Sequence, residues 1–518
     1  MGKYERKRKH GRIYSALLIS VSVLILLVGS LCFFSAAWYV RTYGRLGFDS
    51  VLFTLTGGLS GVQSGLVESF LLGGALPAVL LTAVVSTLLF IRWKKVILHL
   101  KNYTIPVLPF RHGTAAVLIL ALSLGLTVHA AFNVELVDYI VNSSTETGLY
   151  EEHYKDPDKV QISFPEQKRN LLYIILESME TSYMSTEEGG ALEYNLIPEL
   201  YALAKQSGNY NFSHNETVGG FMQVSGASWT IGSMVAQTSG VPLKTPEGVS
   251  DWQNGYGKDG VFLPGITCLT DILDANGYNQ ALMVGSDASF GGRRTYYNTH
   301  GTDAIYDIYT ARKDGIVPPK YWNGWWGFED PYLFSYAKDV LTEMSQEGEP
   351  FAFTMLTVDT HHIGGFKCAL CGDTYEENYE NVISCSSRQV LSFLQWVMEQ
   401  DWFENTTVIV TGDHYSMDKG YFTRNVDEGY TRHVYNCFIN SAAEPVRTKN
   451  RQFCALDMFP STLAAMGCTI EGERLGLGTN LFSPMPTLME KMGYDAFNKE
   501  LSKAADYYDR FYVSKPEE

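Results

Sequence analysis

The sequence predicts an α/β domain with a mainly parallel sheet flanked by helices, preceded by an N-terminal bundle of about three transmembrane helices. Two observations support this fold class. Uncharged runs of bilayer-spanning length lie near the N-terminus, and apolar, β-branched runs alternate with helical patterns in the rest of the chain. Because the chain has 518 residues, it is long enough for two or three structural units.

Three uncharged apolar segments, residues 13–40, 70–91 and 114–132, are expected to cross the membrane. Each has about the length that spans a bilayer as a helix, roughly 20 residues. A signal peptide is the alternative for the first segment, but its apolar run is too long and no small-residue cleavage site follows it. Residues 51–67 are uncharged but rich in Gly and Ser. We expect them to form an interfacial or re-entrant segment, or a plain extracellular loop.

The basic residues predict the orientation of these helices. Six lysines and arginines lie in residues 1–12 and five more lie in residues 92–112, so the positive-inside rule makes both segments cytoplasmic. An odd number of crossings then places everything after about residue 133 outside the cell. We therefore expect a membrane domain (1–133), a polar, aperiodic linker (134–167) and an extracytoplasmic domain (168–518).

Charge disfavours one class of partner, nucleic acid. The whole chain carries a net charge of −16, and residues 1–133 carry about +10, which leaves about −26 for the outer part. Such an acidic domain is unfavourable for binding nucleic acid. It suits a soluble domain held beside an anionic membrane rather than attracted to it.

Cysteine usage leaves two interpretations open. Cys32 lies in the first apolar segment, and the other seven cysteines lie in the outer part, where disulfides are permitted. The pair Cys368 and Cys371 has the C-x2-C spacing of half a zinc site, but no second pair at matching spacing exists. We expect a local disulfide here.

Apolar runs in the outer part predict the strands of a covered parallel sheet. Residues 170–176, 351–358 and 406–412 are such runs, and residues 386–399 place apolar side chains at helical spacing. In sheets of this kind the working site lies beyond the carboxyl ends of the strands.

Polar side chains follow all three predicted strands. Glu177 follows the first strand. The residues expected beside it at one edge are Asp359, Thr360, His361 and His362 after the second strand, and Asp413 and His414 after the third. Glu177, Asp413 and His414 offer two oxygen ligands and one nitrogen ligand, which suit Mn²⁺, Mg²⁺ or Zn²⁺. The alternative is that Glu177 caps a helix and that residues 412–415 form a polar turn.

A hydroxyl is the expected fourth member of the site. Residues 224–242 supply Ser225, Ser228 and Thr230 before an apparent helix start, where backbone amides favour an anion such as phosphate. A hydroxyl that also touches a metal ion becomes a nucleophile at neutral pH. The alternative role is an ordinary helix N-cap.

Several motifs resemble those of the membrane-anchored phosphoglycerol transferases of the alkaline phosphatase and sulfatase superfamily. Within that family the glucan-modifying enzymes are more similar to this chain than the lipoteichoic acid synthases. The resemblance covers about residues 170–485 and rests on LESMETSY, SWTIGSMVAQTSGVP, TVDTHHIGGFKCALC, VTGDHY, LDMFPSTLAAMG and GERLGLGTNLFS.

The resemblance implies a set of site residues. Glu177, Thr230, Asp413 and His414 would hold one metal ion, commonly Mn²⁺, with Thr230 as the nucleophile and Ser228 as the alternative. His361 would lie near the leaving or attacking oxygen and Arg293 would grip the glycerol phosphate; His362 is a further substrate-binding candidate.

The chain departs from the family in three ways. Gly291 stands where lipoteichoic acid synthases have a Trp, and three membrane helices are expected where those enzymes have five. The C-x-P-x-R and S-x-P-x-R signatures of sulfatases are absent from the sequence, which disfavours sulfate-ester hydrolysis.

The implied function is transfer of phosphoglycerol from phosphatidylglycerol to an acceptor, through a phosphoglycerol-threonine intermediate and with release of diacylglycerol. The implied acceptor is a glycan of the bacterial cell envelope, such as a periplasmic glucan, or a glycerol-phosphate polymer such as lipoteichoic acid. Two alternatives are a phosphoethanolamine transferase and a non-catalytic envelope protein that binds a polymer. The implied location is the bacterial cell membrane, with several crossings.

Overall fold

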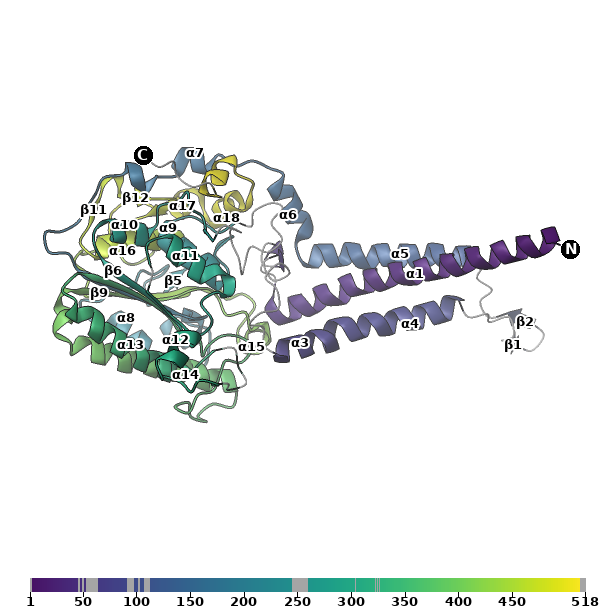
Figure 1. Cartoon of the computed structure of the whole chain (residues 1–518), viewed down its shortest axis with the longest axis horizontal. Helices are drawn as coiled ribbons and strands as arrows, with labels where there is room; N and C mark the ends of the chain where they lie inside the picture. The colour runs from purple at the N-terminus through teal and green to yellow at the C-terminus, as the bar shows by residue number, and fades with distance from the viewer. Residues whose placement is uncertain are drawn as a thin grey trace. The chain divides into compact units, whose positions relative to one another are not determined.

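The structure is a computed structural model whose described residues form two compact units (Figure 1). One unit comprises Met1–Phe48 and Val62–Asp138, and the other comprises Asp49–Gly61 and Tyr139–Glu518. We describe each unit by itself. The described residues are 2–44, 47–48, 51–52, 64–90, 97–100, 103–106, 112–244, 260–302, 304–321, 323, 325 and 327–512.

Among its described residues, the first unit contains three helices long and apolar enough to cross a membrane, within Ile13–Tyr43, Gly65–Phe90 and His112–Asn133. This confirms the predicted N-terminal apolar helices. The second begins earlier than expected, because a π-helical segment joins two α-helices into one run. Most of the expected interfacial segment lies outside the described residues, although 64–67 belong to this run. The elements are α1 (Gly2–Tyr43), α3 (Ser64–Phe70), η1 (Leu71–Ala75), α4 (Leu76–Phe90), β1 (Ile97–Leu100), β2 (Tyr103–Pro106) and α5 (His112–Asn133).

Small and hydroxyl side chains let the apolar helices pack closely. A Cβ on Gly29 of α1 would collide with Ser123 of α5, and the Ser123 hydroxyl donates to the Ile25 carbonyl at 2.8 Å. On α4, Thr82 reaches the Ser30 hydroxyl of α1 at 3.4 Å. Close backbone approach and interhelical hydrogen bonds are the main sources of helix association in lipid.

A seven-stranded, mostly parallel sheet forms the centre of the second unit, in the order β5-β10-β9-β4-β8-β6-β7. β4 pairs in parallel with β8 and β9, and β10 runs antiparallel to β9. This confirms the predicted α/β class. The strands are β4 (Asn170–Leu176), β5 (Gly220–Phe221), β6 (Asn279–Val284), β7 (Ala304–Tyr306), β8 (Phe351–Leu356), β9 (Thr406–Gly412) and β10 (Val434–Ile439).

Helices cover both faces of this sheet (Figure 1). All seven residues of β4 are buried, and its alternate side chains enter two different cores. Tyr173 and Ile175 join the core with α9, α10, α11 and α16, whereas Leu172 and Ile174 join the core with α8, α13 and α14. Double coverage explains why the strand is apolar without alternation. The helices are α8 (Pro198–Lys205), α9 (Thr230–Ser239), α10 (Leu269–Ala275), α11 (Arg293–Thr299), α12 (Ile308–Lys313), α13 (Asp330–Gln346), α14 (Asn378–Met398), α15 (Lys419–Asn425) and α16 (Met458–Ala465).

The segment expected as a linker, residues 134–167, carries secondary structure. It contains α6 (Leu136–Ser143), α7 (Leu149–His153), η2 (Pro157–Lys159) and β3 (Ile162–Ser163). One of its contacts is with the C-terminal region: Thr147 donates its backbone N–H to the Ala504 carbonyl at 3.0 Å. The remaining elements are η3 (Thr181–Tyr183), η4 (Thr186–Glu188), η5 (Phe290–Gly292), η6 (Asp401–Asn405), η7 (Ala455–Asp457), β11 (Thr469–Ile470), η8 (Glu471–Glu473), β12 (Arg474–Leu475), β13 (Gly478–Thr479), α17 (Leu488–Met492), α18 (Tyr494–Ser502) and η9 (Asp506–Tyr512).

All eight cysteines lie in the described part of the chain, and all are free thiols. The expected disulfide between Cys368 and Cys371 is therefore not formed: their Sγ atoms lie 3.6 Å apart. The expectation was wrong, and the C-x2-C spacing also did not reveal a third thiol, that of Cys385, whose Sγ lies 3.9 Å from that of Cys368.

Candidate active site at the strand ends

Parallel pairing of β4 and β9 brings the predicted ligands together. Leu176 pairs with Gly412 at the last position of both strands, so the residues that follow, Glu177 and Asp413, emerge side by side. The ligand atoms of Glu177, Asp413 and His414 all lie within 4.8 Å of one another. All three residues are at most 1% exposed. Carboxylates and an imidazole this deeply buried need a compensating partner.

Thr230 completes the cluster as the first residue of α9. Its hydroxyl lies 3.4 Å from Glu177 Oε2 and 3.3 Å from His414 Nε2. The same helix face is tied to the end of β9, because Ser233 donates to the Asp413 carbonyl at 2.6 Å and Gln237 donates to the Gly412 carbonyl at 3.1 Å. These bonds hold the helix N-terminus, with its exposed amides and positive dipole end, against the carboxylates.

Ser178 organises the two carboxylates, and sequence reasoning missed it. Its backbone N–H donates to Asp413 Oδ1 at 2.7 Å, and its hydroxyl donates to Glu177 Oε1 at 2.8 Å. It has a φ of 54°, in the left-handed region that non-glycine residues rarely adopt. Its position directly after Glu177 at a strand end was the available signal. Ser233 and Gln237 were also missed, although they follow Thr230 at helical spacing.

The donor set fits a divalent cation. Asp413 Oδ2 is buried and makes no hydrogen bond, so one carboxylate oxygen is available as a ligand. His414 Nδ1 lies 2.8 Å from the Tyr415 carbonyl; since a carbonyl only accepts, Nδ1 carries the proton and Nε2 offers its lone pair. Burial and the charge of Glu177 raise the pKa of Asp413 to about 7. A cation would relieve the repulsion between these carboxylates.

His361 and His362 follow the end of β8. The Nδ1 atom of His361 lies 2.7 Å from the His362 carbonyl, which again places the proton on Nδ1. The two rings stack with their centroids 4.4 Å apart. Although residue 361 is partly exposed, burial of its ring lowers the pKa of His361 to about 4. Burial also lowers the pKa of His362 well below its ordinary value.

Arg293 begins α11 directly after two left-handed glycines, Gly291 and Gly292. Its side chain is 2% exposed and donates to the Phe290 carbonyl, the Ser286 hydroxyl and the Asp287 carbonyl at 2.8–3.1 Å. Burial lowers the pKa of Arg293 to about 10, against the charges of nearby carboxylates that include Glu177 and Asp413. The guanidinium is therefore a fixed cation within electrostatic reach of the cluster.

Asp359 and Thr360, also expected at this edge, support the structure rather than join the cluster. Asp359 forms a buried carboxyl pair with Asp330 of α13, in which the Asp330 backbone N–H donates to Asp359 at 3.2 Å. Burial and the charge of Asp330 raise the pKa of Asp359 well above its ordinary value. The Thr360 hydroxyl donates to the Glu177 carbonyl at 2.5 Å, so β8 helps to hold the residue that carries the first ligand.

The chain is similar in sequence to known phosphoglycerol transferases. Phosphoglycerol transferase I of Escherichia fergusonii is 32% identical over 379 residues, which are 71% of this chain and 45% of the relative. The same protein from Citrobacter koseri is 31% identical with the same coverage. The chain thus spans about half the length of the curated relatives it matches.

Two solved structures share the fold. The lipoteichoic acid synthase LtaP from Listeria monocytogenes matches with a TM-score of 0.51 and 15% identity, covering 70% of this chain and 97% of that one. The lipooligosaccharide phosphoethanolamine transferase A from Neisseria meningitidis matches with a TM-score of 0.51 and 13% identity, covering 87% and 84%. The Sulfatase family matches residues 169–468, a span that includes every site residue described above. The chain belongs to the Sulfatase family.

Proposed function

We propose that the protein is a metal-dependent phosphoglycerol transferase. In this proposal it moves phosphoglycerol from phosphatidylglycerol to a hydroxyl of a cell-envelope glycan or glycerol-phosphate polymer, and releases diacylglycerol. The observation that carries the proposal is the Thr230 hydroxyl, held 3.3–3.4 Å from both His414 and Glu177 at the N-terminus of α9. A hydroxyl held there is suited to nucleophilic attack on phosphorus. The names of the 31–32% identical relatives supply the head group.

Glu177, Asp413, His414 and the Thr230 hydroxyl would hold the metal ion, which we expect to be Mn²⁺, with Mg²⁺ or Zn²⁺ as alternatives. When bound, the ion supplies positive charge that lowers the pKa of the hydroxyl and stabilises anionic phosphate oxygen. The two carboxylates and one imidazole leave room in this set for oxygen ligands from a substrate.

In the first half of the reaction, Thr230 Oγ1 gives up its proton to solvent and forms a bond to phosphorus, and the bond from phosphorus to the diacylglycerol oxygen breaks. Arg293 offers a fixed positive charge to the phosphoryl oxygens or the glycerol end. His361 gives the departing oxygen a proton, and His362, stacked on it, belongs to the same substrate-binding wall. The bound phosphodiester carries a negative charge that favours the protonated form of His361, which burial alone disfavours.

In the second half, an acceptor hydroxyl attacks phosphorus and the bond from phosphorus to Thr230 breaks. His361, now neutral, accepts the proton of the acceptor, and Thr230 Oγ1 takes up a proton from solvent. Each residue thus returns to its starting state. Because the second half reverses the steps of the first, one nucleophile and one acid–base residue serve both halves.

The apolar helices fit a lipid donor, because they would keep the active domain beside the bilayer. We propose three crossings, at about residues 13–40, 70–91 and 114–132, with the domain after the 134–167 segment outside the bacterial cell membrane. The clusters of basic residues in 1–12 and 92–112 support this orientation.

The test is mass spectrometry of the full-length protein in detergent after incubation with phosphatidylglycerol. We expect a phosphoglycerol adduct on Thr230 that is absent from Thr230→Ala and retained in the neighbouring control Ser228→Ala. An adduct on Ser228 would reassign the nucleophile. Labelled phosphatidylethanolamine in a parallel reaction tests the alternative head group, and labelling by that lipid alone would replace phosphoglycerol with phosphoethanolamine. No adduct with either lipid would contradict both and favour a non-catalytic protein.

A further inference from the structure

A second metal-capable cluster consists of three thiols. Cys368 and Cys371 lie in the segment between β8 and α14, and Cys385 lies on α14. The Sγ atom of Cys368 is 3.6 Å from that of Cys371 and 3.9 Å from that of Cys385. All three Sγ atoms lie within 4.8 Å of one another. None of the mechanism above uses these residues.

The sulfur separations match thiolates around one ion. Zn²⁺ binds thiolate at about 2.3 Å and prefers tetrahedral coordination, which places two sulfur ligands about 3.8 Å apart. The separations of 3.6 and 3.9 Å fall on either side of this value. A disulfide would instead require two sulfurs at about 2.05 Å and would leave the third thiol without a role.

Gln389 adds an independent indication of a ligand at this place. It is 8% exposed, and its Oε1 atom is buried without a hydrogen bond. Its Nε2 atom lies 3.3 Å from Cys385 Sγ and 3.7 Å from Cys368 Sγ. Because the O and N atoms of an amide exchange places by a simple flip, the carbonyl oxygen can turn toward the sulfurs as a fourth ligand. The flip would bring the carbonyl oxygen to the place where the amide now faces the Cys368 and Cys385 sulfurs.

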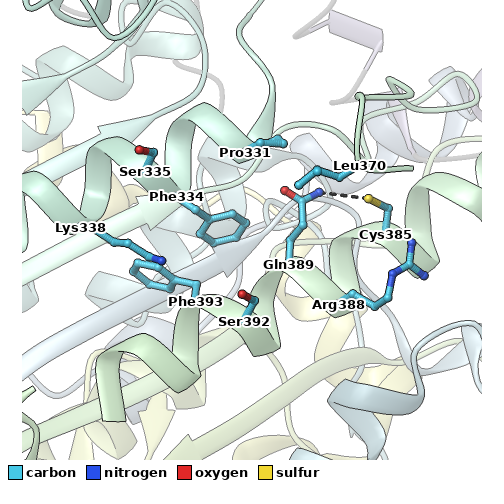
Figure 2. A pocket seen from close by; sticks show the side chains of 10 residues that line it. All are labelled: Pro331, Phe334, Ser335, Lys338, Leu370, Cys385, Arg388, Gln389, Ser392 and Phe393. Atoms are coloured by element: carbon cyan, nitrogen blue, oxygen red, sulfur yellow. Dashed lines mark hydrogen bonds between the residues drawn. The ribbon is translucent and has the colours of Figure 1, made fainter. Parts of the chain in front are cut away.

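A pocket of about 380 Å³ gives access to this cluster. Its walls include Leu370, Cys385, Arg388 and Gln389, and Figure 2 shows the Gln389 amide hydrogen bonded to Cys385 beside it. Cys371 is also partly exposed. The Arg388 guanidinium, one position before Gln389 on α14, offers positive charge near a site whose three thiolates outweigh a divalent ion.

We propose that Cys368, Cys371 and Cys385 bind one structural Zn²⁺, with the Gln389 carbonyl oxygen as the fourth ligand. Binding replaces the three thiol protons, which are released to solvent. The ion joins the segment after His361 and His362 to α14. A four-ligand site of this kind has no open position for chemistry, so its role is to hold that segment in place.

The first experiment measures zinc in the full-length protein, purified in detergent under nitrogen without chelator or reductant. The background variant Asp413→Asn removes a ligand of the strand-end cluster, so that zinc bound there does not interfere. We expect one zinc per chain in Asp413→Asn and none above the buffer level in Asp413→Asn/Cys371→Ser. The matched control Asp413→Asn/Cys32→Ser, which alters a cysteine in α1, should retain the ion. Absence of zinc from Asp413→Asn would overturn the proposal.

The second experiment needs no variant, so misfolding of Cys371→Ser does not weaken the test. Maleimide labelling of the wild-type protein, mapped by peptide mass spectrometry, should modify Cys371 and Cys385 at least several-fold faster once a chelator is added. Equal rates with and without chelator would overturn the proposal, as would a Cys368–Cys371 disulfide in the purified protein. Cys371→His replaces the thiolate with an imidazole nitrogen, which also binds zinc, so this variant should retain the ion.

Discussion

The two metal-capable clusters of this protein are built in opposite ways. Glu177, Asp413 and His414 combine oxygen and nitrogen ligands from the ends of two adjacent parallel strands, β4 and β9. The thiol cluster combines a C-x2-C pair in a loop with one cysteine from the second turn of α14. In our proposals, the first leaves ligand positions for a substrate, whereas sulfur and an amide close the second. Ligand type and openness would then separate a reactive site from a structural one.

The largest expected effect comes from Asp413→Asn, which removes charge from the strand-end cluster. We expect turnover of phosphatidylglycerol to fall by roughly 10³-fold or more, because the nucleophile and the transition-state charge lose their cation together. The measurement is diacylglycerol release in detergent micelles.

A matched control is Asp457→Asn. Asp457 is also buried and accepts two backbone N–H groups, from Cys454 at 3.0 Å and from Thr479 at 2.8 Å. Its replacement should reduce stability and leave turnover per folded molecule unchanged. Equal loss of turnover in both variants would show that burial, rather than metal binding, explains the effect.

A smaller effect is expected from Ser178→Ala, which leaves every proposed ligand in place. The lost hydroxyl orients Glu177 at 2.8 Å, and loss of such supporting hydrogen bonds typically weakens metal affinity by about 10–100-fold. Titration of activity with Mn²⁺ should therefore show a higher half-saturating concentration and a recoverable maximum rate.

The corresponding control is Ser239→Ala, at the far end of α9, where the hydroxyl donates to the Val235 carbonyl of its own helix. This variant should keep the wild-type Mn²⁺ dependence. If excess Mn²⁺ fails to restore Ser178→Ala, the residue acts on chemistry rather than on metal binding.

A substitution in the thiol cluster should reduce stability more than turnover, the opposite of what we expect for the strand-end cluster. Cys371→Ser should lower the thermal midpoint of the full-length protein, by about 1 °C for each kcal/mol of lost stability in a unit of this size, while turnover of the folded fraction changes only a few-fold. A differential scanning measurement beside the diacylglycerol assay checks both values. A thousand-fold loss of turnover without a change in midpoint would show that the two clusters are not functionally distinct.

The smallest effect on activity is expected from a histidine pair outside both clusters. This pair should instead affect the stability of the protein at acid pH. The rings of His214 and His433 stack with centroids 3.4 Å apart. Burial lowers the pKa of His433 to about 3 and that of His214 to about 4. Below about pH 6.5 the unfolded chain binds more protons than the folded chain. The contribution of the two histidines to the free energy of unfolding is therefore complete above about pH 6.5 and is lost as the pH falls toward 4.

We expect His433→Asn to reduce this pH dependence, by up to about 1.4 kcal/mol for each pH unit below 6.5. Urea unfolding of the wild type and the variant, compared between pH 7.5 and 5, measures the difference in slope. Identical slopes would show that the pair does not control acid stability. Activity near neutral pH should be unaffected in the folded protein.

The sequence by itself determined the parts of this protein that depend on local patterns. Residues 170–176 and 406–412 were predicted as strands with the same limits that β4 and β9 have, because strands buried on both faces must be continuously apolar. The bilayer-length helices were likewise predictable from the number of consecutive uncharged, apolar residues. Since parallel strands end at one edge, the proximity of Glu177 and Asp413 was predictable as well.

Tertiary structure alone decided contacts between residues far apart in the chain without a shared strand register. Residue types alone left Ser225, Ser228 and Thr230 as candidates, and the family resemblance favoured Thr230; the packing of α9 against the end of β9 places Thr230 beside the carboxylates. Asp359 had the same pattern as Asp413, yet it pairs with Asp330. Cys385 is 14 positions from Cys371, and only the fold of the intervening loop onto α14 makes them neighbours. Such contacts arise from packing, for which sequence periodicity carries no signal.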